Sequence, residues 1–305
     1  MCGIIAVLRK RSTREVPASD SLVGPFGALT KELETAEAQD LAAAIDAAAT
    51  GLEGVDRALR GVPGIQALIE DRSLAVIIDE HITELTAVLA SIESRIDETV
   101  PSSGLEATNA AVVRLKDVLW AIQRDRLRTA SAVADLAGPN PSLSAIEACA
   151  SVQAALSALD RLEVRGRDSA GLMLLVHGHG LDLGHQSVDA LLAHRTKDPL
   201  FTSGAVRVTP EGHLSFVYKA AAEIGELGDN TAALRSAIRE DPLLHLALSN
   251  NEAQCTVLGH TRWASIGIIS QPNAHPMNSD EINLDAGPYV TAALNGDVDN
   301  FADLK

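Results

Sequence analysis

The sequence lacks three features, and each absence excludes a class of protein. It has no apolar run of the roughly 18 residues that a membrane-spanning helix needs, and the short apolar start is soon followed by arginines and lysines, so a signal peptide does not fit either. It has no basic cluster, and 41 acidic against 25 basic residues give a formal charge of −16. Such a surface does not favour nucleic acid. We therefore expect a cytoplasmic protein without nucleic-acid or membrane partners.

Cysteine is also scarce. The three cysteines, Cys2, Cys149 and Cys255, are an odd number without metal-ligand spacing, which argues against a disulfide framework and a zinc site. No metal and no cofactor are expected. Cys149 lies in an alanine-rich run and Cys255 precedes an apolar strand, so both are interpreted as packing residues. Cys2 differs, because it stands directly behind the initiator methionine in MCGII.

Residues 12–138 have a composition of their own, rich in Ala, Leu, Glu and Asp and poor in aromatics. Turn residues at 61–64 and 100–104 divide this region, and we expect a shorter helical stretch over about 31–60. Apolar residues recur every three or four positions and predict a helical hairpin or small bundle. These stripes are Ile78, Ile82, Leu85, Leu89, Ile92 and Ile96, then Val112, Leu115, Leu119 and Ile122. The alternatives for this region are packing alone, binding of a partner, and self-association.

The remaining sequence, 1–11 and 139–305, mixes strand and helix patterns. CGIIAVL predicts a buried strand. Further strands are expected at 172–177, 205–208, 213–220, 256–264 and 289–296, and helices at about 143–162 and 232–241. With 305 residues and 46% hydrophobic content, the chain can hold two ordinary domains. We expect a mixed core over 1–11 and 139–305, into which 12–138 is inserted.

Cys2 could act as a nucleophile if removal of Met1 makes it the N-terminus. A cysteine attacks a carbonyl as a thiolate, or with a base beside it. The freed α-amine, with a pKa roughly near 8, would supply that base. Gly3 would leave room for a substrate to approach.

Four motifs follow Cys2 along the chain: RGRDSAG at 165–171, GHTRWASIG at 259–267, NAHP at 273–276 and LNGDVDNF at 294–301. In this order they resemble the class II glutamine amidotransferases, most of all the glucosamine-6-phosphate synthases. Those enzymes combine a strand beginning CGI, a RGYDSAG-type turn, a HTRWATHG-type loop, NAHP and a late NG. The resemblance covers less than half of the chain, in separate blocks.

The resemblance implies a fold and an activity. The fold would be α+β, the four-layer αββα core of the N-terminal-nucleophile hydrolases, incomplete here and interrupted by the helical bundle. The activity would be hydrolysis of the glutamine side-chain amide through a cysteine thioester. Ammonia would pass to a sugar phosphate, fructose 6-phosphate giving glucosamine 6-phosphate, in a downstream or separate synthase domain.

The resemblance also assigns roles to residues of this sequence. Cys2 would be the nucleophile, and Asn295 and Gly296 would form the oxyanion hole. Arg262 would bind the substrate carboxylate, because a guanidinium fork matches it. The remaining assignments are Trp263 near the ammonia exit, Ser265 in glutamine binding, Asp168 and Ser169 in a local Asx- or Ser-type turn, and His260 and His275 as structural hydrogen-bonding groups rather than acid–base catalysts.

The sequence departs from the pattern in places, and other interpretations stay open. Ile266 and Met277 replace histidines of the family, and the chain stops at Lys305, soon after Gly296. We therefore expect a part of a longer polypeptide, or a fold that a second chain completes. Two alternatives are an amidophosphoribosyltransferase-like enzyme, whose loop more often has RYS than RWA, and a non-catalytic assembly or regulatory protein on a degenerate amidotransferase core.

Overall fold

The chain divides into two compact units in a computed structural model that describes residues 2–37, 39–99, 104–221, 226–264, 267–279, 288–296, 298 and 300–304. Unit 1 comprises Met1–Arg11 and Asp135–Lys305, and unit 2 comprises Ser12–Ala134. The first strand is therefore separated in sequence from the rest of its own unit. The border falls at 134/135, four residues before the expected 138/139, and lies inside a helix, α6.

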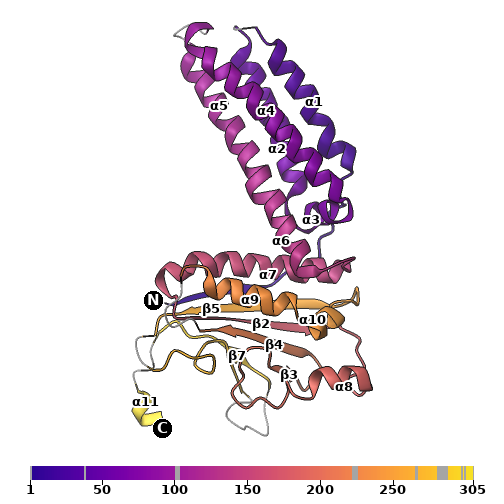
Figure 1. The fold of residues 1–305 in the computed structure, drawn as a ribbon, viewed down its shortest axis with the longest axis vertical. Coiled ribbons are helices and arrows are strands. Elements are labelled where there is room, and N and C mark those ends of the chain that lie inside the picture. Colours follow the sequence, from indigo (N-terminus) through magenta and orange to yellow (C-terminus); the bar gives the residue numbers. More distant parts are fainter. Residues whose placement is uncertain are drawn as a thin grey trace. The chain divides into compact units, whose positions relative to one another are not determined.

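Unit 2 is a helical bundle (Figure 1). Its long helices pack pairwise, α1 on α2 and α4, and α2 on α5. The helices are α1 (Ser19–Thr35), α2 (Leu41–Leu59), α3 (Gly61–Glu70), α4 (Arg72–Thr99), α5 (Leu105–Trp120), the π-helical segment η1 (Ala121–Leu127) and α6 (Arg128–Ala137).

Burial in unit 2 confirms the two predicted stripes, since every residue of both is buried, from Ile78 to Ile96 and from Val112 to Ile122. The single helical stretch expected over 31–60 is wrong, because two helices, α1 and α2, occupy this part of the chain. The turn expected at 61–64 is instead the first turn of α3. Pro63 is tolerated there because the N–H groups of a first helical turn have no intrahelical partner.

Unit 1 contains a five-stranded antiparallel sheet in the order β1-β5-β2-β4-β3 (Figure 1). A two-stranded piece, β6-β7, is separate from it. The strands are β1 (Gly3–Val7), β2 (Ser169–His177), β3 (Val206–Val208), β4 (Leu214–Ala220), β5 (Gln254–Arg262), β6 (Met277–Asn278) and β7 (Thr291–Ala292).

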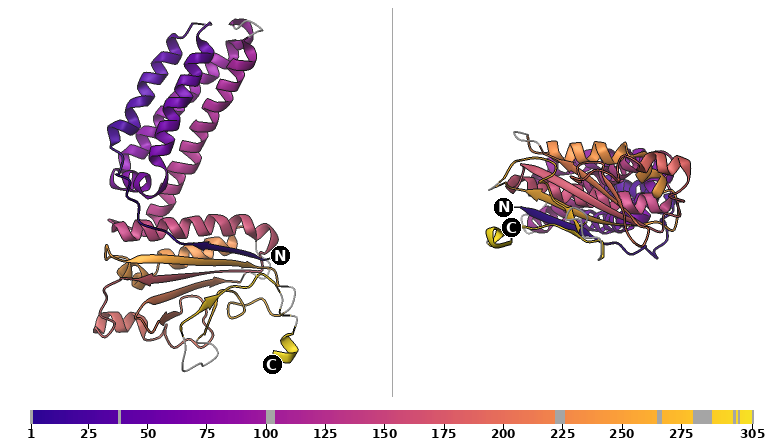
Figure 2. Two further views of the ribbon diagram at one scale, coloured as in Figure 1. Left: turned by 180° about the vertical axis from the view of Figure 1, so that it is seen from behind. Right: turned by 90° about the horizontal axis from the view of Figure 1, so that it is seen from below.

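Helices α7 and α9 lie across one face of the sheet (Figures 1 and 2), where α7 contacts β1 and β5 and α9 contacts β2 and β4. On the other side Tyr289, just before β7, donates its hydroxyl to Ser215 Oγ of β4 at 2.8 Å. The helices of unit 1 are α7 (Leu143–Leu162), η2 (Glu163–Arg165), α8 (Gln186–Leu192), α9 (Asp229–Arg239), α10 (Pro242–Ala247) and α11 (Phe301–Leu304).

The prediction that CGIIAVL forms a buried strand is wrong in one respect. β1 is an edge strand that pairs only with β5 among the described strands, and Ile4 remains 41% exposed. A short apolar run does not distinguish an edge strand from a central one, because the number of neighbouring strands is a tertiary property. Among the described residues no helix is both long and apolar enough to cross a membrane.

Candidate active site

Cys2 lies where β1 begins and β5 ends. Gly3 is paired with Thr261, so the residue before Gly3 meets the chain as it leaves β5. The backbone N–H of Trp263 donates to the Cys2 Sγ at 3.4 Å, and the sulfur is 3.9 Å from the carbonyl oxygen of the same residue. The half-buried thiol therefore lies against the Trp263 peptide. Met1 lies outside the described residues.

Gly3 has a different role from the one expected. A Cβ built on it would lie 2.7 Å from Leu162 Cδ1, at the end of α7. The missing side chain therefore makes room for α7 rather than for a substrate.

The RGRDSAG segment joins the loop after β5. The Asp168 N–H donates to the Arg262 carbonyl at 3.1 Å, and Asp168 Oδ2 accepts the Ala264 N–H at 2.6 Å. The expected local turn at Asp168 is thus a long-range bond to the RWAS loop. Ser169 begins β2 opposite Arg262 and is fully buried.

Arg262 and the NAHP motif meet at one carbonyl group. Arg262 Nη1 donates to the Ile268 oxygen at 3.2 Å, and Asn273 Nδ2 donates to the same oxygen at 3.0 Å. Trp263 remains 55% exposed. Ser265, the expected glutamine contact, lies outside the described residues.

His260 and His275 hold the segment that leads to Asn295. His260 Nε2 donates to the Leu294 carbonyl at 3.0 Å, and the Leu294 N–H donates to His275 Nδ1 at 3.3 Å. Their ring centroids are 4.8 Å apart. Asn295 and Gly296 follow directly and are exposed. Within the described residues no hydrogen bond joins Asn295 to Cys2.

Burial lowers the pKa of both histidines. The pKa of His260 falls from 6.5 to about 4, chiefly because the ring is buried and secondly because of the neighbouring His275. The pKa of His275 is lowered by its burial and by the positive charges of Lys219 and Arg262. Both rings are therefore neutral near pH 7, and neutral rings suit the bonds to Leu294.

Several residues that support this region are not predictable from the sequence. Lys219 in β4 is only 2% exposed. It pairs with Gly171 of the neighbouring strand β2, and Gly171 pairs on its other side with His260 of β5. Asn230 Nδ2 donates to the Arg167 carbonyl at 2.8 Å. The fully buried Glu163 accepts the Gly228 N–H at 2.7 Å, and burial raises its pKa. Asn230 stands at the start of a helix, where a cap is the usual interpretation, so no sequence signal identified its partner.

The other two cysteines lie apart from this arrangement. Cys149 in α7 is buried, and burial raises its pKa to about 12. Burial also raises the pKa of Cys255. Thiols of this kind are poor nucleophiles. Among the described residues no group of histidine, cysteine or acidic side chains could hold a metal ion.

Comparison with known proteins relates part of the chain to one kind of enzyme. The glutamine–fructose-6-phosphate aminotransferase (isomerizing) of Corynebacterium efficiens is 31% identical over 105 residues, and that of Corynebacterium diphtheriae is 30% identical over 105 residues. Each match covers 34% of this chain and 13% of the relative, so the chain spans about an eighth of the curated relatives that it matches. No family model matches the chain. No solved structure matches it either.

Proposed function

We propose that this chain carries the glutaminase site of a class II glutamine amidotransferase. The observation that carries the proposal is the position of Cys2, whose sulfur accepts the Trp263 N–H at the point where the RGRDSAG, RWAS and NAHP segments meet. The partial similarity to glutamine–fructose-6-phosphate aminotransferases supports the same chemistry. The fold proposed with it is the αββα core of the N-terminal-nucleophile hydrolases. The antiparallel sheet with helices on one face supports it.

In the proposed mechanism Met1 is removed and the α-amine of Cys2 takes the thiol proton. The sulfur attacks the side-chain carbonyl carbon of glutamine, and the carbonyl oxygen becomes an oxyanion. Asn295, through its side-chain amide, and Gly296, through its N–H, stabilise that oxyanion. The proton passes to the leaving nitrogen, ammonia departs past Trp263, and a thioester remains. Water then cleaves the thioester, which releases glutamate and restores the thiol.

Arg262 is proposed to bind the substrate α-carboxylate. Its guanidinium is already oriented by the hydrogen bond to the Ile268 carbonyl. Gly267 lies beside the guanidinium, since a Cβ built on this glycine would be 3.5 Å from Arg262 Nη2. The ammonia acceptor is proposed from the relatives' name: fructose 6-phosphate, giving glucosamine 6-phosphate. The site for that acceptor would belong to a downstream or separate synthase domain.

The test is the intact mass of the protein from its own host, followed by reaction with the glutamine analogue diazo-oxonorleucine. We expect a chain that begins at Cys2 and gains one adduct there. An Asn295→Ala variant should still lose Met1 but turn glutamine over about 10²- to 10³-fold more slowly. A chain that keeps Met1 and takes no label would instead support the non-catalytic alternative, in which unit 2 provides the partner-binding surface.

A further inference from the structure

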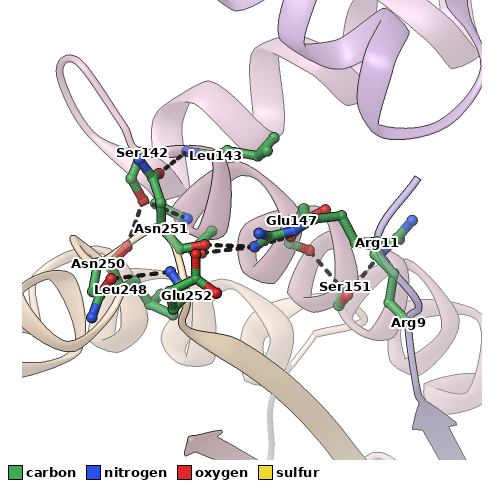
Figure 3. Close-up of polar contacts among 12 residues, drawn as sticks. Arg9, Arg11, Ser142, Leu143, Glu147, Ser151, Leu248, Asn250, Asn251 and Glu252 are labelled. Carbon is green, nitrogen blue, oxygen red and sulfur yellow. Dashed lines mark hydrogen bonds and ion pairs between the residues drawn. The ribbon is translucent and has the colours of Figure 1, made fainter. Parts of the chain in front are cut away.

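Two arginines just beyond β1 attach that strand to α7 (Figure 3). Arg9 Nε donates to Ser151 Oγ at 3.1 Å, and Arg11 Nε donates to Glu147 Oε2 at 3.1 Å. Ser151 is 1% exposed and Glu147 is 8% exposed. A carboxylate with so little access to water needs a cationic partner, so Arg11 is not replaceable by a neutral side chain without loss.

Arg11 also reaches the loop that precedes β5. Its Nη2 donates to Ser144 Oγ at 3.2 Å and to the Asn251 carbonyl at 2.8 Å. Asn251 Oδ1 in turn accepts the Leu143 N–H, the first of α7, at 3.3 Å. One guanidinium therefore connects the segment that follows β1 with α7 and with the loop before β5 (Figure 3).

The other end of β1 meets the same helix. Gly3 packs against Leu162 so closely that a Cβ would lie 2.7 Å from its Cδ1. Between Ser151 and Leu162 the helix rises by roughly 16 Å, and the chain from Gly3 to Arg9, which contains β1 and the two residues after it, extends by at most roughly 20 Å. These lengths match well enough for α7 to hold β1 at both ends. Moving the strand along by two residues would bring Ile5 against Leu162, where no side chain fits.

We propose that Arg11 is a positioning residue for Cys2. This inference rests on the proposed glutaminase function. Among the described strands β1 pairs with a single neighbour, along five residues, and Cys2 lies just beyond its end. The chain passes into unit 2 directly after Arg11. Arg11 and Gly3 keep β1, and with it the Cys2 sulfur, in register against β5. Arg11 is the attachment that lies nearest in sequence to the start of unit 2.

The proposal predicts which kinetic constant changes. Arg262, the proposed substrate anchor, belongs to β5, so loss of the Arg11 contacts shifts the nucleophile and not the anchor. Binding of a glutamine analogue is retained, while attack on it slows. A displacement on the order of 1 Å is enough to slow a positioned reaction by about 10²-fold.

The experiment uses the full chain beginning at Cys2 and measures kinact and KI for diazo-oxonorleucine. For Arg11→Ala we expect kinact to fall at least tenfold and KI to stay within twofold. Arg11→Lys keeps the charge but makes fewer contacts, so its kinact should lie between those of the wild type and Arg11→Ala. The matched control is Lys10→Ala, because Lys10 is the exposed neighbour of Arg11.

Hydrogen exchange on the same variants distinguishes a local loosening of β1 from a general loss of folding. It also tests the role of Arg11 independently of the proposed function. Peptides covering β1 should exchange faster in Arg11→Ala, while those covering β2 should be unchanged. Unchanged kinact together with unchanged β1 exchange overturns the proposal, and so does equal loss of protection in β1 and β2. If the wild-type chain does not react with the analogue, the proposed function is wrong. The β1 exchange rate then still decides whether Arg11 holds the strand.

Discussion

Leu294 illustrates how single residues organise the candidate site. Its carbonyl accepts from His260 Nε2, and its N–H donates to His275 Nδ1. The second bond needs an unprotonated His275 ring, and burial keeps both rings neutral by lowering their pKa values. The position of the following Asn295 therefore depends on two neutral imidazoles.

This arrangement predicts loss of stability in acid. The pKa of His260 is about 4 in the folded protein and 6.5, its ordinary value, in the unfolded chain. Between these two pH values the unfolded chain therefore binds more protons than the folded one. Stability from this group is complete above pH 6.5 and declines as the pH falls towards 4, by up to about 3 kcal/mol. In urea denaturation at a series of pH values, His260→Gln should lose less stability over this interval than the wild type.

The control for this prediction is His194→Gln, since His194 is exposed. It should show the pH dependence of the wild type. A His260→Gln variant with the same pH dependence as the wild type would mean that another group accounts for the acid sensitivity.

At the scale of elements, the NAHP loop lies closely against the backbone of β2 at Gly171. A Cβ built on Gly171 would lie 2.1 Å from the His275 carbonyl oxygen. The glycine is therefore required by close approach of another chain segment, and this contact brings His275 beside His260 on the neighbouring strand.

Gly171→Ala should destabilise unit 1 by about 1–3 kcal/mol, because backbone cannot move aside as a flexible side chain can. Gly184→Ala is the matched control in the same unit, since the atom nearest to its Cβ is 3.4 Å away, an ordinary contact. That change should stay within about 0.5 kcal/mol. The two tryptophans, Trp120 and Trp263, lie in different units, so a Trp120→Phe background lets fluorescence during urea denaturation report unit 1. Equal urea midpoints for Gly171→Ala and Gly184→Ala would contradict the close contact between Gly171 and the His275 carbonyl.

At the scale of the whole molecule, unit 2 has polar contacts and a core of its own. Arg114 binds Glu53 and Asp46 between α5 and α2, and the buried Asp56 binds Arg60 and Arg126. The buried stripes of α4 and α5 complete a core formed within 12–134.

We therefore expect residues 12–134 to fold when produced alone. The fragment should show a strongly helical circular dichroism spectrum and a single cooperative thermal transition, because its apolar stripes bury against one another. A gradual, non-cooperative transition would show that this unit needs the rest of the chain. A fragment covering 19–70, which lacks α4 and α5, is the matched control and should not fold cooperatively.

The candidate site was predictable from sequence as a set of motifs, but not as a set of contacts. The order of Cys2, RGRDSAG, RWAS and NAHP indicated that these segments belong together. It did not reveal that Asp168 bonds to Ala264, that Gly3 makes room for Leu162, or that the buried Lys219 lies opposite Gly171. Each of these contacts joins residues far apart in sequence.

The sequence by itself determined the helical stripes of unit 2 and most strands of unit 1, because the periods of helix and strand are local properties of the chain. Only the tertiary structure decided that β1 is an edge strand, that 31–60 breaks into two helices, and which residues Arg11 and the two histidines bind. Periodicity shows which side chains share a face of an element. What packs against that face depends on segments that the chain brings together from a distance.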